Sequence, residues 1–366
     1  MEWKYPDFDR CLVNLSCSVE KFFGLTPAHA TLPEADRLLQ QNRPRNVLLL
    51  VLDGMGTAIC RDNLDADGFF GSHLVCGISS VFPPTTVAAT TSIQSARYPN
   101  EHGWLGWDVY FPEVGENVTV FRNTRSGTDE PAAAYPIAET LRPYESVQKR
   151  VAAAGFGGYS VQPFGEFDTL EKMAGEITRL CALPGRKYLY CYWAEPDHSL
   201  HEVGRKGEKI PALVRELESW VRALSAQLTD SLLFVTADHG HIDHRGTCLA
   251  DHPAIAEALA REPSIEPRAV NLFVKDGYKA DFPARFAREF GEHFLLLPRA
   301  QVLAQGLFGP GANHPMLEAS IGDFLAVAKD EMTLFNTREQ CEHMVGVHAG
   351  LCAEEVDVPL IAIPCP

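Results

Sequence analysis

Short apolar segments that alternate with helical patterns constrain this fold more than any other feature of the chain. The segment Asn46–Leu52 (NVLLLVL) is apolar on both faces, as strands are inside a covered parallel sheet. Comparable runs lie at Gly155–Val161, Lys187–Trp193, Ser231–Thr236 and Val358–Ile363. The helical patterns lie at Val87–Arg97, Tyr144–Ala154, Asp168–Leu180 and Pro211–Leu228. The alternation predicts an α/β domain built on a mostly parallel sheet.

The pattern changes between His252 and Leu317. This region holds the short runs AVNLFV, PARFAREF and HFLLLP, followed by the Gly- and Pro-rich segment GLFGPGANHP. We expect residues 252–317 to form a smaller inserted cap subdomain, and residues 1–251 and 318–366 to form the α/β core. The insert is expected to shape a substrate pocket, although it contains no motif that identifies the substrate.

Composition narrows the range of partners. The 366 residues are 46% hydrophobic and 22% charged, which is typical of a globular chain with a sizeable core. The formal net charge of −16 argues against nucleic acid and against an anionic membrane as partners. The N-terminus lacks a signal-peptide pattern, and the ten cysteines are scattered without a CxxC pair. We therefore expect a cytoplasmic protein with reduced thiols.

Acidic and histidine residues follow the predicted strands. Ligands of open α/β sheets bind at the carboxyl ends of the strands, so these positions are candidates for a site. The candidates are Asp53 in LVLDGMG, Asp197 and His201 in EPDHSLHEVG, Asp238 and His239 in TADHG, and His348 in GVHAGL. Each cluster alone is more often a turn, a helix cap or a core residue. Together they supply carboxylates and imidazoles suited to two zinc-like cations.

A candidate nucleophile lies in the segment SVFPPTTVAATTS. The two prolines, Pro83 and Pro84, favour an extended entry, and a helix-compatible stretch follows them. Thr85 or Thr86 therefore falls near a helix N-terminus, where free N–H groups favour a phosphoryl group. The alternative for either threonine is a simple helix N-cap.

These motifs, in this order, resemble the alkaline phosphatase superfamily, and within it the nucleotide pyrophosphatase/phosphodiesterase branch. The resemblance spans roughly Asn46 to Ile363. It implies a three-layer α/β fold and a metal-dependent phosphodiesterase or nucleotide pyrophosphatase that acts on a small phosphoester. It also implies a phosphothreonine intermediate. Because the family's nucleophile lies thirteen residues before the proline of its YP pair, here Pro99, the resemblance favours Thr86 over Thr85.

The resemblance also implies a ligand set for two divalent ions, which would be zinc. One ion would be held by Asp53, Thr86, Asp238 and His239, and the other by Asp197, His201 and His348. Two asparagines that hold phosphoryl oxygens in the phosphodiesterases correspond here to Ala89 and Trp107. Trp104 and Trp107 would stack on a leaving group or belong to the core.

Several alternatives stay open. Within the superfamily these are a phosphomonoesterase and a phosphonate hydrolase. The string HGHIDH at His239–His244 also spells the metal signature of the metallo-β-lactamase fold, another class of dinuclear zinc hydrolase. A metal-binding protein without catalysis is the non-enzyme alternative. A Rossmann oxidoreductase is disfavoured because DGMG lacks the GxGxxG spacing.

Overall fold

The largest sheet of the computed structural model, which describes residues 3–366, has six strands in the order β2-β17-β8-β1-β7-β6. β6, β7, β1 and β8 are parallel, and β17 runs antiparallel to both of its neighbours. The strands are β1 (Asn46–Leu52), β2 (Leu74–Ser79), β6 (Gly157–Val161), β7 (Lys187–Trp193), β8 (Ser231–Thr236) and β17 (Asp357–Cys365). The predicted mostly parallel sheet is confirmed.

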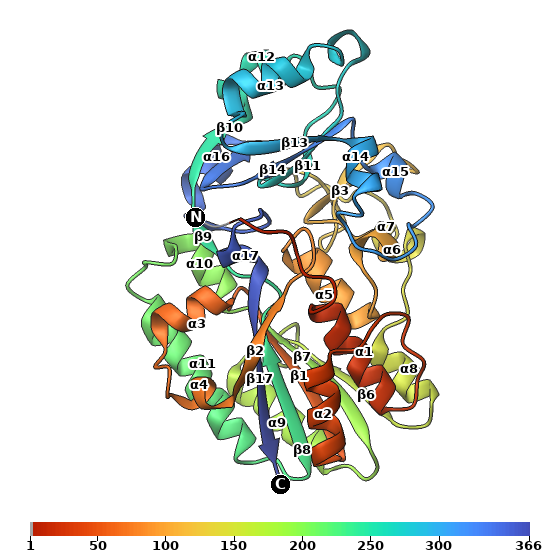
Figure 1. Cartoon of the computed structure of the whole chain (residues 1–366), viewed down its shortest axis with the longest axis vertical. Helices are drawn as coiled ribbons and strands as arrows, with labels where there is room; N and C mark the ends of the chain where they lie inside the picture. Colours follow the sequence, from red (N-terminus) through yellow and green to blue (C-terminus); the bar gives the residue numbers. More distant parts are fainter. Residues whose placement is uncertain (1–2) are drawn as a thin grey trace.

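Helices cover both faces of this sheet (Figure 1). One layer comprises α1 (Leu12–Phe22), α2 (Pro33–Asn42), α5 (Thr86–Ser95) and α8 (Val147–Ala153). The other comprises α3 (Thr57–Asn63), α4 (Phe69–His73), α9 (Leu170–Ala182) and α11 (Ile210–Ser225). Every residue of β1 and β8 is buried between the layers, which explains their continuous apolar sequences. The chain therefore has the expected three-layer α/β architecture.

A second sheet of seven strands lies above the carboxyl edge of the first in Figure 1. Its strands are β13 (Phe294–Pro298), β14 (Phe324–Ala328), β12 (Ala269–Leu272), β11 (Ser264–Glu266), β3 (Asp108–Phe111), β4 (Glu116–Thr119) and β5 (Thr124–Arg125). All its pairings are antiparallel. The sheet thus draws on residues 252–317 and also on segments before and after that range. The division into a core and a cap stays a prediction.

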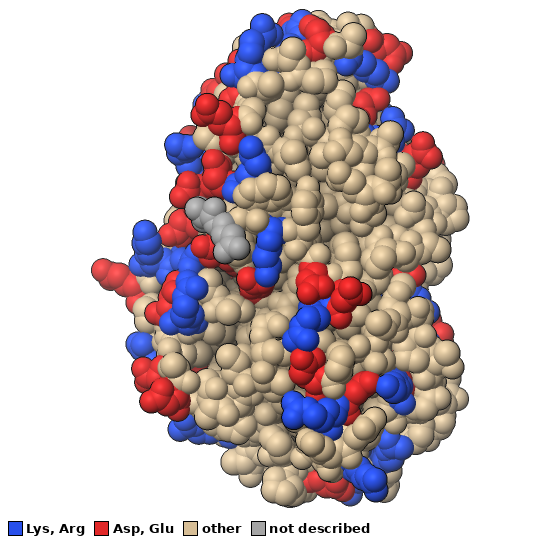
Figure 2. Space-filling model, viewed as in Figure 1, with Lys and Arg blue, Asp and Glu red and all other residues tan. Residues whose placement is uncertain are grey.

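The outer surface shows no segregation of charge on the face drawn in Figure 2, where acidic and basic side chains are interspersed. No helix among residues 3–366 combines the length and the apolarity that a membrane-spanning helix needs. The expected cytoplasmic location and the expected lack of nucleic-acid and membrane partners stay predictions.

A buried ion pair joins the second sheet to the loop that carries His348. Arg268, just before β12, donates from Nε to Glu355 Oε1 and from Nη2 to Glu355 Oε2, both at 2.7 Å. The same carboxylate accepts the backbone N–H groups of Gly350 and Cys352 at 2.7 and 3.1 Å. Both charged side chains are fully buried. This carboxylate therefore fixes the loop that follows His348.

We expect Arg268→Met to lower the free energy of unfolding by about 3–5 kcal/mol, because it leaves the Glu355 carboxylate buried without its counter-charge. Urea unfolding followed by circular dichroism measures the loss. Adding Glu355→Gln to this variant should restore part of the stability, since the buried charge is then removed. A loss below about 1 kcal/mol in the single variant would show that water or another group compensates the carboxylate.

Candidate metal centre and substrate pocket

Asp53 and Asp238 lie side by side because their strands are neighbours in the sheet. Asp53 directly follows β1, and Asp238 follows β8 by two residues. Their residues are 2% and 0% exposed. Gly54 makes the turn after β1 with a φ of +71°, and a Cβ there would lie 3.0 Å from the Cα of Asp197. Glycine thus allows the acidic turns to approach one another.

Asp197 and His201 belong to α10 (Asp197–Val203), which follows β7. Their spacing of four residues places both on one face of the helix, as expected from the sequence. His201 Nε2 lies 3.4 Å from Asp197 Oδ1. β7 is the other neighbour of β1, so the three strand ends bring the three carboxylates to one edge.

His239 and His348 come from distant parts of the chain and stack on each other. Their ring centroids lie 3.8 Å apart, with an interplanar angle of 22°. A two-stranded ladder between β9 (Ile242–Asp243) and β16 (Gly346–Val347) brings the two segments together. The predicted ligands therefore converge on one centre, where Asp197 and His201 are partly exposed and the others are buried.

Three of the histidines point their Nε2 atom toward this centre. In each of them Nδ1 contacts a backbone carbonyl oxygen: His201 that of Gly346 at 2.8 Å, His239 that of Gly240 at 3.1 Å and His348 that of Pro84 at 3.2 Å. A neutral ring that donates from Nδ1 keeps a lone pair on Nε2. These outer contacts orient Nε2 as they do in metal-binding histidines.

Thr85 and Thr86 point to different surroundings. Thr86, the first residue of α5, has its Oγ1 3.2 Å from His239 Nε2 and 3.5 Å from both oxygens of Asp53. Thr85 occupies the N-cap position, but its hydroxyl donates to Glu266 Oε1 at 2.5 Å. Only Thr86 of the pair therefore faces the acidic and histidine cluster.

The electrostatics of the centre call for a counter-charge. Burial, and then the neighbouring carboxylates, raise the pKa values of Asp53 and Asp238 well above their usual range. Burial also acts to raise the pKa of Asp197, but His201 and the other nearby imidazoles hold it well below its usual range. Asp238 Oδ2 is buried with no hydrogen-bond partner among residues 3–366. A carboxylate oxygen left in this state fits a divalent cation.

Donor atoms form two groups compact enough for a metal ion. Asp53, Asp197 and His239 offer one group, and Asp197, His201, His241 and His348 offer the other, each with all atoms within 4.8 Å of one another. Both donor sets are of the nitrogen and oxygen type that zinc prefers.

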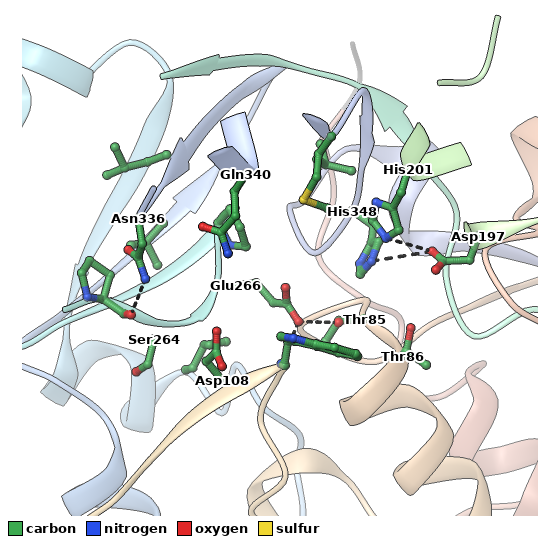
Figure 3. A pocket seen from close by; sticks show the side chains of 18 of the residues that line it. Thr85, Thr86, Asp108, Asp197, His201, Ser264, Glu266, Asn336, Gln340 and His348 are labelled. Carbon is green, nitrogen blue, oxygen red and sulfur yellow. Dashed lines mark hydrogen bonds and ion pairs between the residues drawn. The ribbon is translucent and has the colours of Figure 1, made fainter. Parts of the chain in front are cut away.

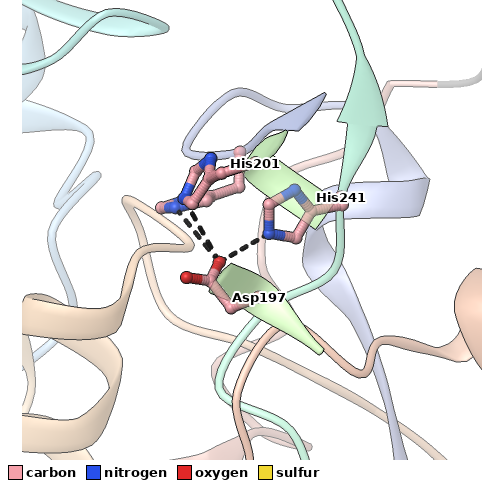
Figure 4. A group of neighbouring side chains, drawn as sticks. Asp197, His201 and His241 are labelled. Carbon is pink, nitrogen blue, oxygen red and sulfur yellow. Dashed lines mark hydrogen bonds and ion pairs between the residues drawn. The ribbon is translucent and has the colours of Figure 1, made fainter. Parts of the chain in front are cut away.

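His241 is a member of this cluster that the family pattern does not assign. Its Nε2 lies 2.6 Å from Asp197 Oδ1 (Figure 4). Burial lowers its pKa to about 3, and a neutral ring with its proton on Nε2 donates to this carboxylate. The separation is that of a hydrogen bond and shorter than the roughly 3.3 Å expected between two ligands at about 2.0 Å in a tetrahedral shell. His241 is thus placed to orient Asp197.

The remaining residues of the string HGHIDH leave the cluster. Asp243 Oδ1 accepts the backbone N–H of Arg205 at 2.6 Å, and His244 Nε2 contacts the carbonyl oxygen of Met344 at 2.6 Å. The metallo-β-lactamase interpretation requires these side chains at the metal, so it is wrong for this chain. His241 was visible in the sequence only through that competing string.

A cavity of about 360 Å³ opens beside Thr86 (Figure 3). Its lining comes from the second sheet and from segments that follow strands of the first, and it includes residues 263–267, as expected for the insert. Trp107 lines it, whereas Trp104 is 5% exposed and packs in the core. Ala89, at one of the expected asparagine positions, is fully buried.

Glu266 also lines the cavity, and burial raises its pKa to about 7. No sequence motif marked it.

Comparisons with known proteins agree with this geometry. The family described as type I phosphodiesterase/nucleotide pyrophosphatase matches residues 47–348. The structure of murine ectonucleotide pyrophosphatase/phosphodiesterase 5 is similar, with a TM-score of 0.66 and 14% identity over 87% of this chain and 88% of that chain. Phosphonoacetate hydrolase from Sinorhizobium meliloti 1021 gives a TM-score of 0.63 and 16% identity over 87% and 90%. No curated protein sequence matches the chain.

The chain therefore belongs to the type I phosphodiesterase/nucleotide pyrophosphatase family. This places it in the alkaline phosphatase superfamily, as the resemblance of its motifs implied. It is an enzyme of the phosphoric ester hydrolase class, and its family is metal-dependent.

We expect His241→Leu to weaken metal binding by about 10- to 100-fold, because Asp197 loses the donor that orients it. Competition with a chromophoric chelator measures the affinity. His241→Gln should recover part of it, since the amide can donate to the same oxygen. His244→Gln is the matched control outside the cluster and should bind metal as the unaltered protein does. The loss of a whole metal equivalent in His241→Leu would instead make His241 a ligand.

Proposed function

We propose that the protein is a two-metal phosphodiesterase or nucleotide pyrophosphatase that acts through a phosphothreonine on Thr86. The observation that carries this proposal is the position of Thr86 Oγ1, at 3.2–3.5 Å from His239 and Asp53 and beside an open cavity. The two divalent ions, proposed to be zinc, would be held by the sets inferred from the family pattern. Those sets are Asp53, Thr86, Asp238 and His239 for one ion and Asp197, His201 and His348 for the other.

The residues of the chain perform the remaining parts of the reaction. Bound cations would supply positive charge to lower the pKa of the attacking hydroxyl and to stabilise the leaving oxygen. Thr86 Oγ1 attacks phosphorus, the bond to the ester oxygen breaks, and water later cleaves the phosphothreonine. The first N–H groups of α5 have no intrahelical acceptor and favour the phosphoryl charge. Tyr192 donates to Asp53 Oδ2 and so holds that carboxylate in place.

We expect Thr86→Ala to retain bound metal but to lose at least about a thousandfold in the hydrolysis of bis(p-nitrophenyl) phosphate, because the nucleophile is gone. Release of p-nitrophenol gives the rate. Thr85→Val removes the adjacent hydroxyl, which bonds Glu266 instead, and should cost no more than about tenfold. Acid quenching followed by mass spectrometry should locate phosphate on Thr86. A larger loss of hydrolysis rate in Thr85→Val than in Thr86→Ala would instead make Thr85 the nucleophile.

Removal of metal tests the two-ion assignment directly. The purified protein should contain about two equivalents of divalent metal, lose diester hydrolysis on dialysis against EDTA, and regain it with zinc. Substitution of a carboxylate or histidine ligand in either set, such as Asp238→Ala or His348→Ala, should lower the metal content by about one equivalent. Metal below one equivalent together with EDTA-insensitive hydrolysis would overturn the proposal.

A phosphonate hydrolase is the second candidate function, since a phosphonoacetate hydrolase is among the similar structures. The assay panel therefore includes p-nitrophenyl phosphate, a pyrophosphate ester and phosphonoacetate beside the diester. A faster turnover of phosphonoacetate or of the monoester would reassign the substrate while keeping the nucleophile and metals.

A further inference from the structure

The two oxygens of Glu266 have different surroundings. Oε1 accepts two hydrogen bonds, from the Thr85 hydroxyl at 2.5 Å and from the backbone N–H of Trp107 at 2.8 Å. Oε2 has no hydrogen-bond partner among residues 3–366, and the side chain lines the cavity next to Thr86. Figure 3 shows the carboxylate at the centre of the pocket wall. Oε1 thus binds the surrounding chain, whereas Oε2 is free to bind a ligand in the cavity.

The charges around this oxygen favour a particular kind of ligand. Asp108 also lines the cavity, with Oδ1 accepting the Thr119 hydroxyl at 2.5 Å. Among residues 3–366, Arg122 is the one lysine or arginine in the lining, and its guanidinium lies 5.9 Å from the centroid of the Trp107 ring. Burial raises the pKa of both carboxyl groups, and in their ionised form they disfavour a second phosphate or a carboxylate in the part of the cavity beyond the metal centre.

A purely structural role for Glu266 explains the contacts of Oε1 but not the presence of Oε2. The two hydrogen bonds that join Thr85 and Trp107 need a single acceptor oxygen, which a neutral amide would provide equally well. The second oxygen and the negative charge serve neither contact. Because Oε2 opens on the cavity, a donor on a bound molecule can reach it and would take the place of water there.

Resting on the proposed function, we infer that Glu266 Oε2 binds a hydrogen-bond donor on the ester group seated in this cavity. The substrate class is accordingly a phosphoester whose substituent carries an ammonium or a hydroxyl group within a few bonds of phosphorus. Substituents that carry an anion, such as the further phosphates of a nucleoside triphosphate, are selected against by Glu266 and Asp108 together.

The test uses the metal-loaded protein and three p-nitrophenyl phosphodiesters that differ only in their second ester group. The second ester group is 2-aminoethyl, 2-hydroxyethyl or propyl, which have similar size but carry an ammonium, a hydroxyl or a methyl group. The rate with the Thr86→Ala protein is subtracted, because the 2-hydroxyl group can itself displace p-nitrophenoxide and form a cyclic phosphate. We then expect kcat/KM for an aminoethyl or hydroxyethyl ester to exceed that for the propyl ester by about tenfold or more. Whichever of the two is preferred identifies the donor as charged or neutral.

Glu266→Gln is the decisive variant, because its amide oxygen can still accept from Thr85 and Trp107 while the charge at Oε2 is lost. The preference for the donor-bearing ester over the propyl ester should fall to about one. Glu262→Gln removes the same charge from an exposed position outside the cavity and should preserve the preference. An equal preference in the unaltered protein and in Glu266→Gln would overturn the inference.

Failure of this inference is distinguishable from failure of the proposed function. Hydrolysis of all three diesters without any preference would remove the role of Glu266 and leave the phosphodiesterase assignment standing. If none is hydrolysed, the proposed function fails, and calorimetric binding of the three esters to the metal-loaded Thr86→Ala protein still decides the role of Glu266. Tighter binding of a donor-bearing ester, abolished by adding Glu266→Gln, supports the role, and equal binding of all three refutes it.

Discussion

Three carboxylates gathered at one end of the cavity, two of them buried, are the constraint on which the rest of this structure depends. Asp53 and Asp238 are nearly or fully buried, and Asp197 is their close neighbour. Burial and mutual repulsion both oppose the ionisation of Asp53 and Asp238, and one oxygen of Asp238 has no partner among residues 3–366. Such a cluster is tolerable when a strong positive charge enters it. The surrounding histidines, fixed at Nδ1 by backbone carbonyls, point their Nε2 atoms at the same place.

The two sheets contribute separate properties to the enzyme. The carboxyl edge of the parallel sheet supplies the carboxylates and Thr86, whereas the antiparallel sheet supplies the outer wall of the cavity. The buried pair of Arg268 and Glu355 joins these parts close to the loop after His348. Because the reacting groups and the ester-binding wall belong to different sheets, the wall can change its chemistry without disturbing the metal centre. On the proposed function, the wall of the cavity, rather than the metal ligands, would therefore select the substrate.

Much of the fold, and the convergence of the candidate metal ligands, was predictable from sequence because each depends on local patterns. β1, β7 and β8 are continuous apolar runs, and parallel neighbours bring the residues after them to one edge. The second sheet was not predictable, because its strands are short and one of its pairings, that of β3 with β11, joins residues more than 150 positions apart. Glu266 carries no motif, and its role depends on two contacts made by tertiary structure. His241 was concealed in a string typical of another fold.

On the proposed assignment, the cavity has opposite polarity at its two ends. Cations at Asp53, Asp197 and Asp238 would attract the phosphoryl group toward Thr86, while Glu266 attracts a donor on the ester substituent. A substrate that satisfies both ends is held in one orientation, with phosphorus next to the nucleophile, which lowers the entropic part of the barrier. Glu266 also holds the hydroxyl of Thr85, the residue before the nucleophile. A ligand on Oε2 would therefore fix the same carboxylate that positions the start of α5, so that recognition of the substituent and alignment of Thr86 reinforce each other.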